Sequence, residues 1–170
     1  MNNIKNKLVV VICIILFIGT CFCLTQQNKR KQPVEALIGI TSKTSESTPP
    51  FTVKFKDNDK KIEPAPWLAQ YNSQGYIIKK VAASMDLEIT ALKDAQINIV
   101  LRGPYERIDG DNPSKRLKEI WVKYTQFTVN GKSIIHEDKV VWHNKPYGYV
   151  IKAQKGNWFL VHLEWEKADK

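Results

Sequence analysis

The chain has 170 residues, of which 43% are hydrophobic and 25% charged, so it can bury one ordinary core but not two. Its 26 basic and 17 acidic residues give a net charge of +9, and the basic residues are spread along the chain. A nucleic-acid partner is not expected, because the basic residues form no stripe interleaved with aromatic residues. The charge is compatible with attraction to anionic lipid or acidic polysaccharide.

The first predicted element is an apolar segment within residues 1–24. Its uncharged run, Leu8 to Leu24, would as a helix rising about 1.5 Å per residue just cross a bilayer core of roughly 30 Å. We therefore predict an N-terminal transmembrane helix that acts as a signal-anchor, in a single-pass membrane protein whose domain lies on the extracytoplasmic side. Two alternatives stay open: a cleaved signal peptide, and a lipoprotein signal in which Ile18-Gly19-Thr20 precedes a lipid-modified Cys21.

Residues 25–50 are polar and rich in Ser, Thr and Pro. Such a composition buries too little apolar surface to offset the entropy of ordering, which predicts a flexible linker. A short apolar patch at residues 34–40 interrupts it, and its pattern does not decide between helix and strand.

Residues 51–170 are predicted to form the β domain, because they contain runs of period two, which are typical of β-strands with one face toward water. An irregular stretch from Arg102 to about Lys118 interrupts these runs. Phe51, Val53 and Phe55 alternate with polar residues, and a second strand is predicted from Tyr76 to Ala83. Residues 87–92 and 95–102 alternate on both sides of a turn at Lys93-Asp94. We expect these two runs to form a hairpin.

The strongest short-range signal lies between Ile120 and Trp142, where two β-rich runs flank Asn130-Gly131. Asn and Gly tolerate the positive φ of a type I′ turn, so this segment predicts a β-hairpin. Two more strands are predicted around a turn at Lys155-Gly156. About seven to nine short strands without a convincing amphipathic helix predict an all-β fold, an antiparallel β-sandwich of jelly-roll or immunoglobulin-like type.

The sequence carries no recognisable catalytic or cofactor-binding motif. All three cysteines lie inside the apolar run of residues 8–24, and His136, His143 and His162 lack the i, i+4 spacing of zinc proteases. Neither a Gly-x-Ser-x-Gly sequence nor a phosphate-binding glycine loop is present. We therefore predict a protein that is not an enzyme and has no cofactor and no metal site. The alternative is an unrecognised hydrolase that uses scattered carboxylates.

Aromatic residues give the remaining indication of function. Trp165 shares a strand face with apolar residues and is predicted to lie in the core. Trp142 differs, because His143-Asn144-Lys145-Pro146-Tyr147 follow it. Flat rings, donors and acceptors in one loop are suited to a sugar ring and its hydroxyl groups.

Three motifs in this order resemble the β-rich accessory domain appended to bacterial sugar transferases of surface polysaccharide and lipooligosaccharide biosynthesis. They are Leu101-Arg102-Gly103-Pro104, the strand from Trp121 into Val129-Asn130-Gly131, and Val141-Trp142-His143-Asn144-Lys145-Pro146-Tyr147. The resemblance covers about residues 75–165. The chain departs from the family pattern at Asn144, where Asp is usual, and by having an apolar anchor in place of a transferase domain.

The resemblance implies a noncatalytic, carbohydrate-associated role in the cell envelope, in which the domain binds or positions surface polysaccharide or its biosynthetic machinery. The carbohydrate-binding candidates are then Arg102, Trp142, His143, Asn144 and Tyr147, with Arg102 donating planar hydrogen bonds and Trp142 stacking on a sugar. Two alternatives stay open. The motifs can be signatures of the fold alone, or the domain can be a protein–protein interaction module of the envelope.

Overall fold

The computed structural model describes residues 33–103, 105–106, 118–119, 121–142 and 145–168. The predicted transmembrane segment at residues 8–24 lies outside these ranges. Among the described residues, no helix has the length and apolar character needed to cross a membrane.

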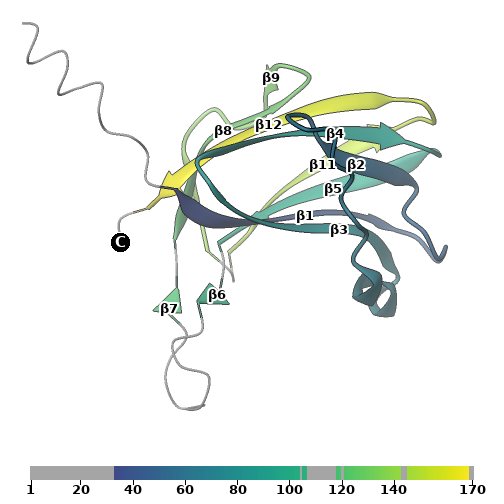
Figure 1. The fold of residues 1–170 in the computed structure, drawn as a ribbon, viewed down its shortest axis with the longest axis horizontal. Helices are drawn as coiled ribbons and strands as arrows, with labels where there is room; N and C mark the ends of the chain where they lie inside the picture. Colours follow the sequence, from purple (N-terminus) through teal and green to yellow (C-terminus); the bar gives the residue numbers. More distant parts are fainter. Residues whose placement is uncertain (1–32, 104, 107–117, 120, 143–144, 169–170) are drawn as a thin grey trace, which may run out of the picture. The chain divides into compact units, whose positions relative to one another are not determined.

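The described residues form an all-β fold with two antiparallel sheets (Figure 1). Sheet A has the strand order β11-β5-β1-β3, and sheet B has the order β10-β8-β12-β4-β2, with β9 paired to β8. A small third sheet pairs β6 with β7. The elements in chain order are β1 (Val34–Lys43), β2 (Phe51–Phe55), the 3₁₀ helix η1 (Pro66–Tyr71), β3 (Ser73–Ala82), β4 (Ser84–Ala91), β5 (Ala95–Arg102), β6 (Tyr105–Glu106), β7 (Lys118–Glu119), β8 (Val122–Val129), β9 (Lys132–Ser133), β10 (Lys139–Val141), β11 (Tyr147–Ala153) and β12 (Trp158–Lys167).

Strand β1 corrects the predicted linker. It lies within residues 25–50, yet it is an inner strand of sheet A that pairs with β3 on one side and β5 on the other. Ala36, Ile38 and Ile40 are fully buried, while the alternate positions, Leu37 and Gly39, face outward and are also nonpolar. The middle of the strand, residues 36–40, is nonpolar at consecutive positions and shows no alternation, and for this reason its sequence did not indicate a strand.

Buried side chains from both sheets form one hydrophobic cluster. Aromatic residues of the two sheets contact each other within it: the ring of Phe51 in β2 lies 5.5 Å from that of Tyr76 in β3, and the ring of Phe127 in β8 lies 5.6 Å from that of Tyr149 in β11. The core position predicted for Trp165 is confirmed, because its side chain is fully buried. Buried side chains of the two sheets therefore contribute to one core.

The hairpin predicted around Lys93-Asp94 is wrong, although both of its strands are present. Strand β4 pairs with β2 and β12 in sheet B, and β5 pairs with β1 and β11 in sheet A. The turn therefore carries the chain from one sheet to the other. Because both strands are buried on one face, they can cover each other across the core as readily as they could pair side by side.

The hairpin predicted around Asn130-Gly131 is confirmed at its turn. Both residues have positive φ, 50° and 76°, and Val129 pairs with Lys132 beside them. The second strand is interrupted after Ser133, and the chain returns to β8 as β10, where Val141 pairs with Val122. One predicted strand is therefore two short ones.

The chain between β2 and η1 covers an edge strand of each sheet. Ile62 donates its N–H to the carbonyl oxygen of Val53 at 3.0 Å, and this bond lies on edge strand β2 of sheet B. Ala65 donates its N–H to the carbonyl oxygen of Gly75 at 2.8 Å, on edge strand β3 of sheet A. Uncovered strand edges are sites of intermolecular pairing, so this connection protects both sheets.

Two tyrosines in the core predict a loss of stability at alkaline pH. Burial raises the pKa of Tyr124 well above that of a free phenol. Burial also raises the pKa of Tyr76, with a contribution from the charge of Glu63. Above about pH 10 the unfolded chain loses the phenolic proton while the folded chain keeps it, so a rise in pH favours unfolding. Below about pH 9 both states keep the proton, and these groups add no pH dependence.

We therefore expect the free energy of unfolding to fall above pH 10, by up to about 1.4 kcal/mol per pH unit for each buried tyrosine. Urea unfolding between pH 8 and pH 11 measures this slope. The Tyr124→Phe variant keeps the buried ring and removes its titration, so its slope should be shallower by up to that amount. An identical slope in the variant and the wild-type protein would contradict the prediction.

Candidate functional site

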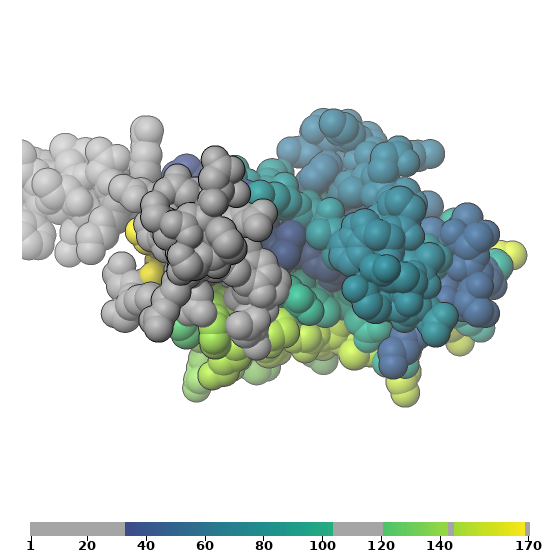
Figure 2. Space-filling model, turned by 90° about the horizontal axis from the view of Figure 1, so that it is seen from below, coloured from purple at the N-terminus to yellow at the C-terminus, as the bar shows by residue number. Residues whose placement is uncertain are grey.

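A groove of about 500 Å³ lies on the outer face of sheet A, the face turned away from sheet B. Figure 1 shows η1 standing on this side of the sheet, and Figure 2 views the same side, where the atoms of β1 lie recessed behind those of η1. The volume is in the range of small-ligand sites. The lining residues come from three strands and η1: Leu37, Gly39, Thr41, Trp67, Leu68, Tyr71, Ser73, Ile77, Val100 and Arg102.

The floor of the groove is nonpolar even though it faces outward. In the register of sheet A, Gly39 of β1 lies between Ile77 of β3 and Val100 of β5. A Cβ added at Gly39 would lie 3.4 Å from Ile77 Cδ1, so a methyl group fits there and a larger side chain would extend into the groove. Gly39 is itself buried between its neighbours, and its missing side chain leaves space above the strand for the groove.

Helix η1 forms the aromatic wall. Pro66 lies at its first turn, where the fixed φ of proline suits helix entry. Asn72 ends the helix in the left-handed conformation, with φ of 50°. Leu68 is buried and anchors the helix, whereas Trp67 and Tyr71 are 54% and 65% exposed. Their rings are perpendicular, with centroids 6.4 Å apart, so the wall presents aromatic faces in two directions.

Arg102 is the positively charged residue in the groove lining. It is the last residue of β5 and pairs with Leu37, on the outward side of the strand. Its side chain is partly buried. No ion pair of Arg102 is found among the residues that the structure describes, so its guanidinium can donate to a ligand.

Three of the five residues predicted to bind carbohydrate are described by the structure, and of these only Arg102 lines this groove. Tyr147 pairs with Leu101, the buried neighbour of Arg102, and packs against the core, so its ring lies on the inner face of the same sheet. Trp142 follows β10 and stacks on Trp121, with ring centroids 5.1 Å apart and planes 21° apart. His143 and Asn144 lie outside the described residues. The structure thus places Arg102 and Tyr147 on opposite faces of sheet A.

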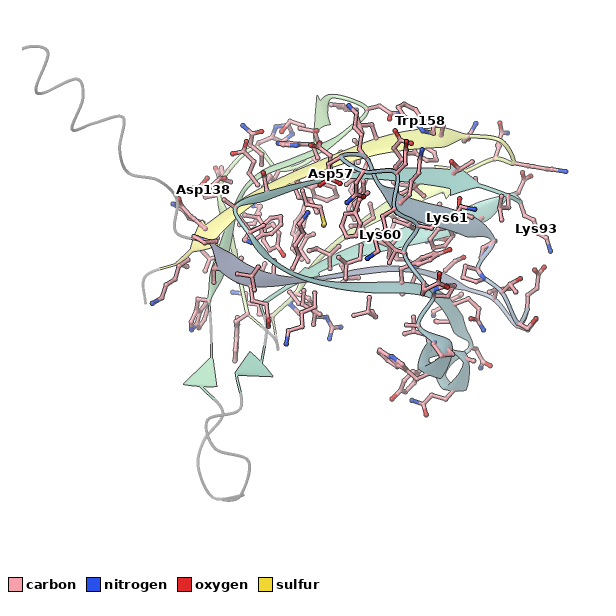
Figure 3. The ribbon with its side chains drawn as sticks, in the orientation of Figure 1. Asp57, Lys60, Lys61, Lys93, Asp138 and Trp158 are labelled. Atoms are coloured by element: carbon pink, nitrogen blue, oxygen red, sulfur yellow. The ribbon has the colours of Figure 1, made fainter. Side chains whose placement is uncertain are left out.

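The outer face of sheet B is polar, and its charged side chains pair with one another. Lys54 lies 2.7 Å from both Asp59 and Glu88, and its hydrogen bonds to these carboxylates raise the pKa of Lys54 to about 12. His162 Nδ1 lies 2.9 Å from an oxygen of Asp86. Exposed Trp158 also belongs to this sheet (Figure 3). Because its ionic groups satisfy one another, this face is less suited to a ligand than the groove on sheet A.

Sequence reasoning missed the aromatic wall and most of the groove floor. Trp67 and Tyr71 lie in a short stretch between prolines and a glycine, where no periodic pattern assigns them a face. A signal for the floor was present in residues 36–40, which are nonpolar at consecutive positions. Outward nonpolar positions on a strand indicate either a covering element or a binding surface, and here η1 covers only part of them.

Compared with known proteins, the chain matches no family model, and it has no significant match among curated proteins or solved structures. The motifs that resemble sugar-transferase accessory domains lie at the end of β5, in β8 and around the end of β10. Apart from Arg102, none of their described residues lines the groove. The geometry of the groove therefore carries the functional proposal.

Proposed function

We propose that this protein is a membrane-anchored, noncatalytic β-sandwich that binds a saccharide in the groove on the outer face of sheet A. Residues 8–24 hold it at the membrane, with the domain on the extracytoplasmic side. Two packed antiparallel sheets without connecting helices favour the β-sandwich. The carbohydrate role agrees with the sequence resemblance to sugar-transferase accessory domains.

The observation that carries the proposal is the pair of exposed rings, Trp67 and Tyr71, above an open groove. The carbon–hydrogen faces of a sugar ring pack against an aromatic face, while its hydroxyl groups need donors and acceptors. Thr41 and Ser73 supply hydroxyl groups to the lining, and Arg102 supplies planar donors. Rings, hydroxyl groups and one guanidinium are suited to holding a sugar, so we propose binding rather than a reaction.

A protein partner is the second candidate. Val81 and Val150 are 64% and 45% exposed, and both face outward on the edge strands of sheet A, β3 and β11. They extend the nonpolar surface beyond the groove on both sides. A flat nonpolar face of this kind fits a partner protein of the cell envelope.

The test uses the full chain in mild detergent on an array of bacterial surface oligosaccharides and polysaccharides. We expect Trp67→Ala and Tyr71→Ala each to weaken saccharide binding about 10- to 100-fold, because exposed aromatic anchors dominate such sites. Trp158→Ala is the matched control, since Trp158 is similarly exposed, at 49%, but belongs to sheet B. This variant should bind like the wild-type protein.

A second variant blocks the groove without removing an aromatic residue. Gly39→Val adds a branched side chain to the floor, where the backbone is an ordinary inner strand. Saccharide binding should be lost while the circular-dichroism spectrum stays β-rich. Binding that survives in Gly39→Val, or that disappears equally in Trp158→Ala, would reject the groove as the site. Absence of saccharide binding together with a defined complex with an envelope protein would favour the second candidate.

A further inference from the structure

The charges on the outer face of sheet A are unbalanced at the groove. Among the described outward positions of its four strands, Glu35 is the one acidic residue. Its carboxylate lies 3.0 Å from Lys79 Nζ, so it is already neutralised. Arg102, inside the groove, and Lys152, outside its lining, have no acidic partner in the described part of this face. The groove therefore carries a positive charge that a ligand can compensate.

The two ends of the groove differ in chemistry and lie well apart. Arg102 is opposite Leu37 on β1, and Ser73, beside the aromatic wall, is opposite Lys43. Six residue steps separate these positions, which is about 20 Å at about 3.3 Å per residue. A single sugar ring is too short to contact both ends. A ligand that fills the groove is therefore a chain of several sugar units.

The guanidinium group of Arg102 indicates which anionic group the ligand carries. Arginine presents a planar set of N–H donors that matches the two oxygens of a carboxylate. Arg102 is partly buried beside Leu37 and Val100, and a nonpolar surrounding strengthens such a charge-assisted pair. Uronic acid units carry this carboxylate on a sugar ring.

We propose that the groove binds an acidic oligosaccharide, with a uronate carboxylate on Arg102 and a neutral sugar face on Trp67 or Tyr71. This inference rests on the proposed saccharide-binding function and narrows its ligand class. Binding takes place without a chemical step. Added salt weakens this binding, because Arg102 is partly exposed to solvent and its charge is screened there.

The experiment measures binding of the full chain in mild detergent to uronate-containing oligosaccharides and to the same oligosaccharides after reduction of their carboxyl groups. We expect carboxyl reduction and Arg102→Gln each to lower affinity about 10- to 100-fold, the value of a charge-assisted hydrogen bond. Arg102→Lys should be intermediate, because it keeps the charge and loses the planar donors. Lys152→Gln removes an equal charge from the same face outside the groove and should bind like the wild-type protein.

The outcomes separate this inference from the function on which it rests. If acidic and reduced oligosaccharides bind equally, and Gly39→Val abolishes both, the groove is a neutral-saccharide site and the acidic ligand is rejected. If neither binds, both proposals fail. Binding to phosphatidylglycerol vesicles that depends on Arg102, without saccharide binding, would assign the charge to an anionic lipid and would also reject the inference.

Discussion

A fragment of residues 51–170 is expected not to fold, whereas a fragment of residues 33–170 should unfold cooperatively. The two differ chiefly in β1, which fills the position between β3 and β5 in sheet A. Without β1, strand β3 loses its partner in sheet A, and β5 keeps β11 on its other side. The shorter fragment would therefore contain sheet B and two separated parts of sheet A.

The free energy lost with β1 is comparable to the stability of a whole domain. Ile38 and Ile40 are fully buried, and each contributes about 1.5–3 kcal/mol through burial. Trp165 Nε1 donates a hydrogen bond to the carbonyl oxygen of Val34 at 2.9 Å, and this buried donor would lose its acceptor at a cost of about 1–3 kcal/mol. Together with the broken pairing in the sheet, these losses reach the 5–15 kcal/mol that stabilises a whole domain.

Circular dichroism and urea unfolding of the two fragments test this expectation. The longer fragment should give a β-rich spectrum and a single sharp transition. The shorter one should give no cooperative transition and should expose hydrophobic surface. Equal unfolding midpoints for the two fragments would show that β1 is dispensable.

Replacing Gly75 by alanine should destabilise the protein by about 4 kcal/mol, which is near the upper end for a single substitution. Gly75 has φ of 157°, and a Cβ at this position would lie 2.1 Å from the carbonyl oxygen of Ile40 and 2.7 Å from Thr41 Cα. Both neighbours are backbone atoms of the inner strand β1. The clash can be relieved only by moving β3 away from β1, since backbone atoms cannot adopt another rotamer.

The matched control for this substitution is Gly148→Ala on β11. A Cβ there meets nothing within 4 Å, and its φ is outside the positive range. We expect no loss of stability and a gain of up to about 1 kcal/mol, because alanine restricts the unfolded chain. Urea unfolding of both variants provides the comparison. A Gly75→Ala variant as stable as Gly148→Ala would contradict the close approach of β3 to β1.

The same substitution should also disturb the groove. The carbonyl oxygen of Gly75 accepts the N–H of Ala65, one residue before η1. A shift of β3 therefore moves the attachment of the helix that carries Trp67 and Tyr71. Saccharide binding should decline in Gly75→Ala even at temperatures where the fold persists.

Strand positions could be predicted from the sequence, but strand partners could not. Alternation places Leu87 and Ile97 on inward faces, and both are buried as expected. Alternation depends only on which face is covered, so it is the same whether two consecutive strands pair or pass into opposite sheets. The turn at Lys93-Asp94 was consistent with both arrangements. At Asn130-Gly131 the two positive φ values decided the geometry locally, and there the prediction is confirmed.

The candidate site was predictable only at Arg102, through the motif Leu101-Arg102-Gly103-Pro104. The predicted loop after Trp142 supplied aromatic and polar groups in sequence, but their neighbours in space decide their roles. Trp142 stacks on Trp121, and neither tryptophan lines the groove. The aromatic wall depends on a connection whose course is set by hydrogen bonds to two edge strands, and no local pattern encodes such long-range contacts.

The connection from β2 to η1 is hydrogen-bonded to an edge strand of each sheet. Its bonds to Val53 and Gly75 occupy backbone acceptors on one edge strand of each sheet. The turn before it is held by Lys54, which binds Asp59 at 2.7 Å. A proteolytic cut within residues 57–65 would thus free two strand edges at once. Both edges would then be open to amyloid-like pairing with a second molecule, so the protection of these two edges against aggregation depends on this one connection.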